Sequence, residues 1–269
     1  MKIAVCWYFN KASQVYDNWR DGLRAAIDIL GKKNKVEWYL DKIRPENDDA
    51  DFILFWDDSN SEFFNHLKEY KAKKGICLTT DPVNMDNLRK LDVVFCESEP
   101  IYKKIRAEGI RVIKAFGTDT DFFKPTDVEK DIEYFYPATF SPWKLQRDIA
   151  YLGDKLLCVG TFQPDGMDDY DACVKTGVKI KLGYFPPDVI RDYYNRAKHV
   201  IIPAVHGSER TVLEAMSMNI LPEVTNDKNI RTKSYINEFK RSNCVDPREF
   251  VVKNYSAFQY AADLERGME

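Results

Sequence analysis

The sequence lacks the features of a membrane, secreted or nucleic-acid-wrapping protein. No stretch approaches the roughly 18 consecutive apolar residues that a membrane span requires. Residues 1–7 form an apolar run typical of a buried strand, not a leader ending in a small-residue cleavage site. The formal charge is −3 and long basic runs are missing. This argues against a protein that mainly wraps nucleic acid, whose phosphates need clustered Lys and Arg, but a local basic patch stays open.

Paired cysteines are missing as well. None of the six cysteines forms a C-x-x-C pair, the spacing typical of metal and redox sites. Four of them lie in apolar, strand-like runs, where a reduced thiol packs as a small apolar group. We therefore expect buried, reduced cysteines and a cytoplasmic protein.

Short apolar runs alternate with amphipathic segments along the whole chain. This alternation predicts an α/β protein with parallel sheets covered by helices. The expected strands are residues 2–7, 35–39, 52–56, 75–78, 93–96, 112–115, 133–137, 156–159, 178–181, 200–203 and 221–225. The expected helices are residues 19–30, 62–73, 101–108, 143–152, 187–197 and 210–218.

The alternation is interrupted near residues 116–130, where glycine, proline and charged residues are concentrated. Such composition is typical of an interdomain linker. We therefore expect two doubly wound, Rossmann-like domains, residues 1–120 and 121–250, and a closing helix over residues 251–269. Ligands of such domains bind beyond the carboxyl ends of the strands.

The most informative segment is residues 200–219. A buried strand ends at Pro203, a polar turn follows, and a helix begins near Arg210. Unsatisfied backbone N–H groups at a helix start favour an anion such as a diphosphate. Glu214 lies one turn inside this helix, where a carboxylate can accept both hydroxyls of a ribose. The predicted contacts to the anion are Gly207, Ser208, Glu209, Arg210 and Thr211.

The run Leu213-Glu214-Ala215-Met216, following Gly207, resembles the retaining glycosyltransferases of family 4 (glycosyl transferases group 1). The resemblance implies the GT-B fold, with Glu214 holding the ribose of a nucleotide-sugar. It implies that Lys144 neutralises the donor diphosphate and that Gly183 and Tyr184 lie where the family's backbone contacts the nucleobase. Residues 110–225 match by motif, and the first 100 residues match by topology alone.

Four positions depart from the family pattern. His206 stands where the family has a glutamate that contacts the transferred sugar, Glu209 stands where it has a second glycine, and Asn219 stands where it has a later glycine. Ala138 stands where an arginine precedes Lys144, so Arg210 is a candidate replacement for that charge. His206 either contacts the donor sugar or caps a turn.

The resemblance predicts a transferase that retains anomeric configuration without a metal ion. The Asp119-Thr120-Asp121 triplet imitates a metal-binding motif, but its linker position argues against that role. A UDP-sugar is the first expectation for the donor, and GDP- and ADP-sugars stay open. We expect Lys144 and His206 to act on the donor, and Asp81 either to orient the acceptor hydroxyl or to cap a turn.

The acceptor is left open among glycans, lipids, small molecules and modified nucleic acid. A transferase acting on modified DNA bases would need a basic groove. The departures also allow a catalytically silent sugar-nucleotide binding protein, and a nucleotide-sugar epimerase is a third reading. The polar segment Tyr8–Gln14, which lacks the glycines common in the family, is a candidate acceptor contact.

Overall fold

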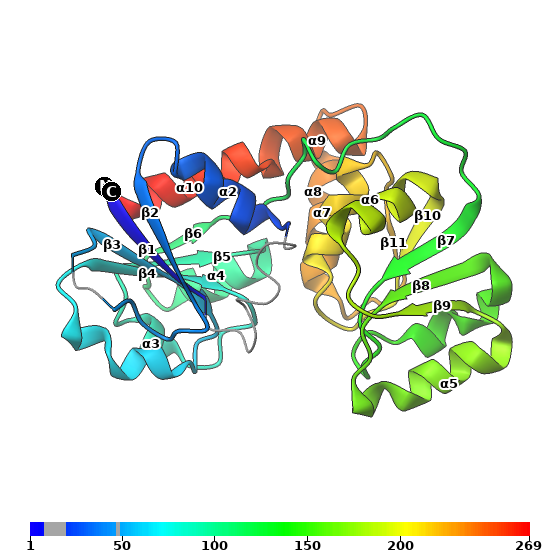
Figure 1. Cartoon of the computed structure of the whole chain (residues 1–269), viewed down its shortest axis with the longest axis horizontal. Coiled ribbons are helices and arrows are strands. Elements are labelled where there is room, and N and C mark those ends of the chain that lie inside the picture. Colours follow the sequence, from blue (N-terminus) through cyan, green and yellow to red (C-terminus); the bar gives the residue numbers. More distant parts are fainter. Residues whose placement is uncertain (8–19, 47–48) are drawn as a thin grey trace. The chain divides into compact units, whose positions relative to one another are not determined.

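A computed structural model describes residues 1–7, 20–46 and 49–269, and it divides the chain into two compact units. Unit 1 comprises Met1–Gly117 together with Tyr255–Glu269, and unit 2 comprises Thr118–Asn254. Each unit is built on one parallel sheet with helices packed against it (Figure 1). The sequence placed the divisions after residues 120 and 250, and the structure places them after residues 117 and 254.

The sheet of unit 1 has the strand order β2-β1-β3-β4-β5-β6, and the strands of the described residues pair in parallel throughout it. Successive residues of β1 point to opposite faces, so Ile3 and Val5 join one core cluster while Ala4 and Cys6 join another. Burial on both faces explains why the strands at Lys2–Trp7, Phe52–Asp57 and Val93–Cys96 are nearly continuous apolar runs. The strands are β1 (Lys2–Trp7), β2 (Lys35–Leu40), β3 (Phe52–Asp57), β4 (Lys73–Leu78), β5 (Val93–Cys96) and β6 (Val112–Lys114).

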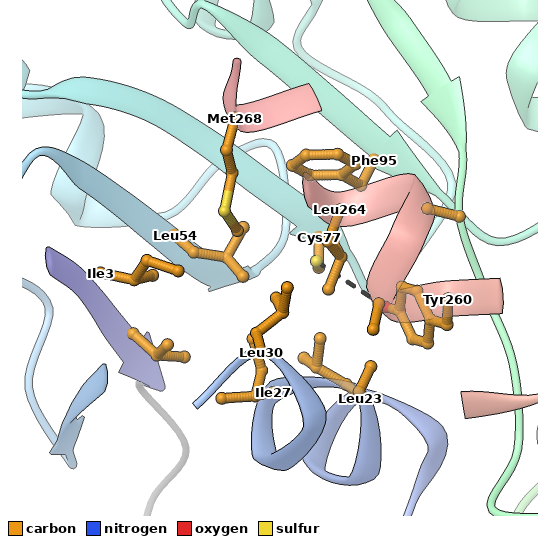
Figure 2. Close-up of a cluster of buried hydrophobic side chains, with 14 of the residues drawn as sticks. Ile3, Leu23, Ile27, Leu30, Leu54, Cys77, Phe95, Tyr260, Leu264 and Met268 are labelled. Carbon is orange, nitrogen blue, oxygen red and sulfur yellow. Dashed lines mark hydrogen bonds between the residues drawn. The ribbon is translucent and has the colours of Figure 1, made fainter. Parts of the chain in front are cut away.

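Helices α2 (Gly22–Leu30) and α10 (Ala257–Met268) lie side by side on one face of this sheet (Figure 1). Leu23 and Ile27 of α2 share a core cluster with Tyr260 and Leu264 of α10, and the Tyr260 hydroxyl donates to Sγ of Cys77 at 3.7 Å (Figure 2). Residues from the other segments pack in the second cluster. These segments are η2 (Glu62–Asn65), η3 (Leu67–Glu69), α3 (Met85–Leu88) and α4 (Glu99–Ala107).

The end of the chain differs from the single closing helix expected over residues 251–269. It forms two helices, α9 (Pro247–Tyr255) and α10, because Ser256 adopts an extended conformation and its side chain caps α10 by accepting from the Gln259 N–H. Close packing fixes α10 in unit 1. A Cβ on Gly267 would lie 2.3 Å from a ring carbon of Phe95, so a larger residue at this position would force Phe95 to shift.

The sheet of unit 2 has the strand order β11-β10-β7-β8-β9, again parallel. The strands are β7 (Ile132–Pro137), β8 (Leu156–Gly160), β9 (Lys179–Leu182), β10 (Ala197–Ile202) and β11 (Glu223–Val224). The helices are η4 (Gln146–Lys155), η5 (Pro164–Gly166), α5 (Met167–Thr176), α6 (Pro187–Arg196), α7 (Glu209–Ser217), α8 (Ile230–Arg241) and α9.

Two predicted helices were wrong. Residues 62–73 form the short 3₁₀ segments η2 and η3, because His66 departs from helical backbone angles between them and Tyr70 is already extended before β4 begins at Lys73. Residues 143–152 contribute to η4, a 3₁₀ run interrupted at Gly153, whose φ is +57°. The sequence also missed α3, α5 and α8, which are short or carry few apolar residues. Within the described residues, no helix is long and apolar enough to cross a membrane.

Candidate active site

The strand order of unit 2 reverses between β7 and β10. From β7 the chain continues to β8 and β9 on one side, then crosses to β10 and β11 on the other. Such a switch point separates the loops beyond the carboxyl ends of the two strands and is the usual ligand site of a doubly wound sheet. The two loops contact each other here, since the Val205 N–H donates to the Trp143 carbonyl at 2.8 Å.

The loop after β10 is held in an unusual backbone conformation. Gly207 and Ser208 have φ values of +72° and +79°, and both are in the left-handed region that favours glycine. The start of α8 fixes this loop from behind. The Asn229 amide donates to the carbonyls of Ala204 and Gly207 at 3.0 and 3.2 Å, and the Thr232 hydroxyl donates to the Gly207 carbonyl at 2.8 Å. The loop is therefore preorganised by buried hydrogen bonds.

Lys144 brings a positive charge to this loop. Its Nζ donates to Oγ of Ser208 at 3.0 Å, and a Cβ on Gly207 would lie 2.9 Å from the same nitrogen. The Tyr136 hydroxyl donates to the Lys144 carbonyl at 3.2 Å and so fixes its backbone. Helix α7 begins one residue later at Glu209, with its N-terminal N–H groups at the same place. A cation and a helix start together favour an anion.

Glu214 is buried rather than exposed on the helix surface, with 5% of its surface accessible. The Tyr194 hydroxyl donates to Oε2 of Glu214 at 3.0 Å, and Nε of Arg210 lies 3.3 Å from Oε1. Burial raises the pKa of Tyr194 well above its ordinary value, so this phenol stays a neutral hydrogen-bond donor. The same hydroxyl lies 3.5 Å from the Thr211 carbonyl, which belongs to the first turn of α7.

Glu209 forms a buried ion pair. Its Oε1 lies 2.6 Å from Nε of Arg231 on α8, and the two side chains are 5% and 9% exposed. The two atoms are close enough for an ion pair, but their relative orientation is not that of a hydrogen bond. The Glu209 side chain is thus committed to the interior, and what Glu209 can offer a ligand at the helix start is its backbone N–H.

The remaining predicted donor contacts lie around this centre. His206 is exposed, and its ring stacks on Trp143 with centroids 6.0 Å apart and planes at 11°. Gly183 and Tyr184 follow β9, at the same edge of the sheet but two strands from β7. Gly183 has a φ of +142° and donates its N–H to the Gly160 carbonyl at 2.9 Å, while Tyr184 is 70% exposed.

The predicted acceptor residues belong to unit 1. Asp81 is exposed in the loop after β4, and the segment Tyr8–Gln14 lies outside the described residues. Asp57 ends the neighbouring strand β3 and accepts from the Ser61 hydroxyl at 2.5 Å and from the Asp58 N–H at 2.8 Å. Burial raises the pKa of the Asp57 carboxyl above its ordinary value.

Several residues that shape the site were missed from the sequence. Tyr194 follows the predicted nucleobase contacts Gly183 and Tyr184 along the chain, and nothing in the sequence linked it to Glu214. Asn229 and Arg231 had no assignment at all. The available signal for Asn229 was its identity as a helix cap, since its side chain accepts from the Thr232 N–H. The aspartates of the linker triplet form a turn, in which Oδ1 of Asp119 accepts from the Phe122 N–H.

Comparison with known proteins gives a clear result for the fold. No protein-family model matches this sequence, and no curated protein matches it. Among solved structures, the glycosyltransferase AviGT4 of avilamycin A biosynthesis aligns with a TM-score of 0.66 and 13% identity, covering 100% of this chain and 97% of its own. T4 phage BGT, solved with its UDP-glucose substrate, aligns with a TM-score of 0.60 and 13% identity over the full length of both chains.

A third solved structure, a trehalose-6-phosphate synthase studied for glycosyl transfer with retention, aligns at 0.64 and 9% identity. The alignment covers 100% of this chain and 99% of the synthase chain. The α/β fold of this chain, with two parallel sheets, is therefore the GT-B fold of these glycosyltransferases. At such low identities the likeness extends to the fold, so donor, acceptor and site residues have to be argued from the chain itself.

Proposed function

We propose that this protein is a glycosyltransferase that moves a sugar from a nucleotide-sugar donor to a hydroxyl acceptor. The observation that carries the proposal is the buried Glu214 carboxylate, held by Tyr194 one turn inside the helix that begins at the Lys144–Ser208 contact. Carboxylate oxygens suit the two hydroxyls of a ribose, and a cation at a helix start suits a diphosphate. AviGT4 and T4 phage BGT, which align with this chain over nearly the whole of both chains, are glycosyltransferases.

Each residue then has a defined role. The backbone N–H groups of Ser208 to Thr211 and the Lys144 ammonium stabilise the negative charge that grows on the leaving diphosphate. His206, on its Trp143 platform, contacts the transferred sugar. The acceptor hydroxyl is held by the first domain, where Asp81 orients it. The family resemblance supports retention of configuration and a reaction without a metal ion.

The donor is proposed to be a UDP-sugar, with GDP- and ADP-sugars as the competing choices. The support is the resemblance at Gly183 and Tyr184, together with T4 phage BGT, whose substrate is UDP-glucose. Gly183 presents its backbone in a conformation that only glycine adopts readily, which suits a main-chain contact to the base.

The test is thermal unfolding of the full chain with UDP, GDP and ADP and their sugar conjugates. A ligand at 100 times its Kd adds about 2.7 kcal/mol, which raises Tm by about 5–10 °C for a protein of this size. We expect one nucleotide class to give this shift, Glu214→Gln to remove it, and the exposed-site control Glu129→Gln to keep it. If no nucleotide raises Tm, the donor site is wrong. Binding without turnover across a panel of acceptors would instead identify a silent sugar-nucleotide binding protein.

A second candidate is transfer to a modified base in DNA. It is favoured by the alignment with T4 phage BGT, described as a DNA-modifying enzyme, over the full length of both chains. The test is nucleotide release from the donor in the presence of duplex DNA carrying hydroxymethylated bases, with unmodified duplex as the control. Turnover that requires the modified base would select this acceptor over glycans, lipids and small molecules.

A further inference from the structure

The structure places two groups of different mobility, Tyr194 and Arg210, beside the Glu214 carboxylate. Tyr194, which reaches Oε2, is fully buried and packed edge-on against Phe123 and Phe135, so its hydroxyl is fixed. The Arg210 side chain, which faces Oε1, is 49% exposed. Arg210 therefore covers the carboxylate from the solvent side, the side from which a ribose diol has to approach.

The contact between Arg210 and Glu214 is easily exchanged. An ion pair with one partner half-exposed is worth little, because water screens it and the long side chain loses rotamer freedom. Arg210 is the second residue of α7, and helical side chains lean toward the helix N-terminus. The same side chain can therefore reach back to the helix start, where the diphosphate of the proposed donor lies.

A second cation beside Lys144 would stabilise a diphosphate bound at the start of α7. A diphosphate carries at least two negative charges, and Lys144 supplies one positive charge beside Ser208. Arg231, the other arginine near this loop, is held inside unit 2 by the Glu209 carboxylate. Arg210 is half-exposed and adjacent, so it can supply that second charge while the Tyr194 hydroxyl and the ribose diol keep the Glu214 carboxylate hydrogen-bonded.

We propose that Arg210 exchanges partners when the donor binds: the ribose diol replaces it at Glu214, and its guanidinium pairs with the diphosphate. This inference rests on the proposed function and deepens it. Arg210 becomes a specificity-determining residue, because it opposes nucleosides, which displace it without compensation, and favours nucleoside diphosphates, which give it a new partner.

The test measures binding of uridine and UDP by titration calorimetry to the full-length wild type and to Arg210→Ala, with guanosine/GDP and adenosine/ADP in parallel. In Arg210→Ala we expect UDP to bind about tenfold more weakly, from the lost charge-assisted contact, and uridine to bind up to about fivefold more tightly. Arg210→Lys should restore part of the UDP affinity. Arg241→Ala, which removes an exposed arginine at the C-terminal end of α8, is the control for net charge.

The opposite signs for uridine and UDP are the decisive feature. Equal changes in affinity for both ligands, or no change for either, would overturn the exchange. The proposed function would still stand in that case if Glu214→Gln abolished UDP binding. If the wild type bound no nucleoside diphosphate of any base, the proposed function itself would fail, and the exchange with it.

Discussion

The buried pair between Glu209 and Arg231 permits a quantitative prediction about the framework of the site. Replacing Arg231 by methionine removes the guanidinium and leaves the Glu209 carboxylate, 5% exposed, without its counter-ion. Breaking such a pair from one side costs about 3–5 kcal/mol. For unit 2, which spans about 140 residues, this lowers Tm by about 10–17 °C. Because Glu209 opens α7, the uncompensated carboxylate should also repel the donor diphosphate and weaken UDP binding.

The check is a double-mutant cycle measured by urea and thermal unfolding of four proteins: wild type, Arg231→Met, Glu209→Gln and the double variant. Removing both charges should recover most of the lost stability, to within about 1 kcal/mol of the wild type, since neither partner is then left charged and buried. The reasoning is refuted if Arg231→Met costs less than about 1 kcal/mol, or if the double variant loses the sum of the two single losses.

Three further changes probe the site and the first unit. Gly207→Ala, at a φ of +72° and with its Cβ against Nζ of Lys144, should cost about 1–2 kcal/mol in urea unfolding and raise the KM for the donor; unchanged values would contradict the strain. Tyr194→Phe leaves Glu214 without its fixed donor and should cost about 1–3 kcal/mol, with donor KM rising more than kcat falls. Burial raises the pKa of Asp57 above 3.8, so its contribution to stability is present below that pH and is lost as pH rises through the raised pKa. Asp57→Asn should therefore have a higher Tm than the wild type at pH 7 and no advantage at pH 3; an equal gain at both pH values would rule out titration as the cause.

Much of the fold followed from local patterns. The first strand was predicted to the residue, and α7 to within one residue at either end, because continuous apolar runs and a 3.6-residue period are written in neighbouring positions. Residues 62–73 defeated the same reasoning. Phe63, Phe64 and Leu67 are buried equally well by one helix or by two 3₁₀ turns, and the backbone at His66 and Tyr70 follows the second course.

The structure brings two of the predicted site residues together. The sequence named Lys144, Ser208 and Glu214, and the structure places Lys144 against Ser208 although 64 positions separate them. The assignments of Asp81, His206 and Tyr184 to bound sugar, acceptor or base stay predictions. Glu209 was expected to face the donor, and burial of its side chain against Arg231 leaves only its backbone for that role.

The sequence by itself determined which segments are strands, where the helix of the donor loop begins and that a carboxylate lies one turn inside it. These features depend on residues within a few positions of one another. Only the tertiary structure decided which distant side chains complete the site: Tyr194 for Glu214, Arg231 for Glu209, and Asn229 for the carbonyl of Gly207. Such partners are chosen by the order of strands in the sheet and by close packing, and neither leaves a local pattern in the chain.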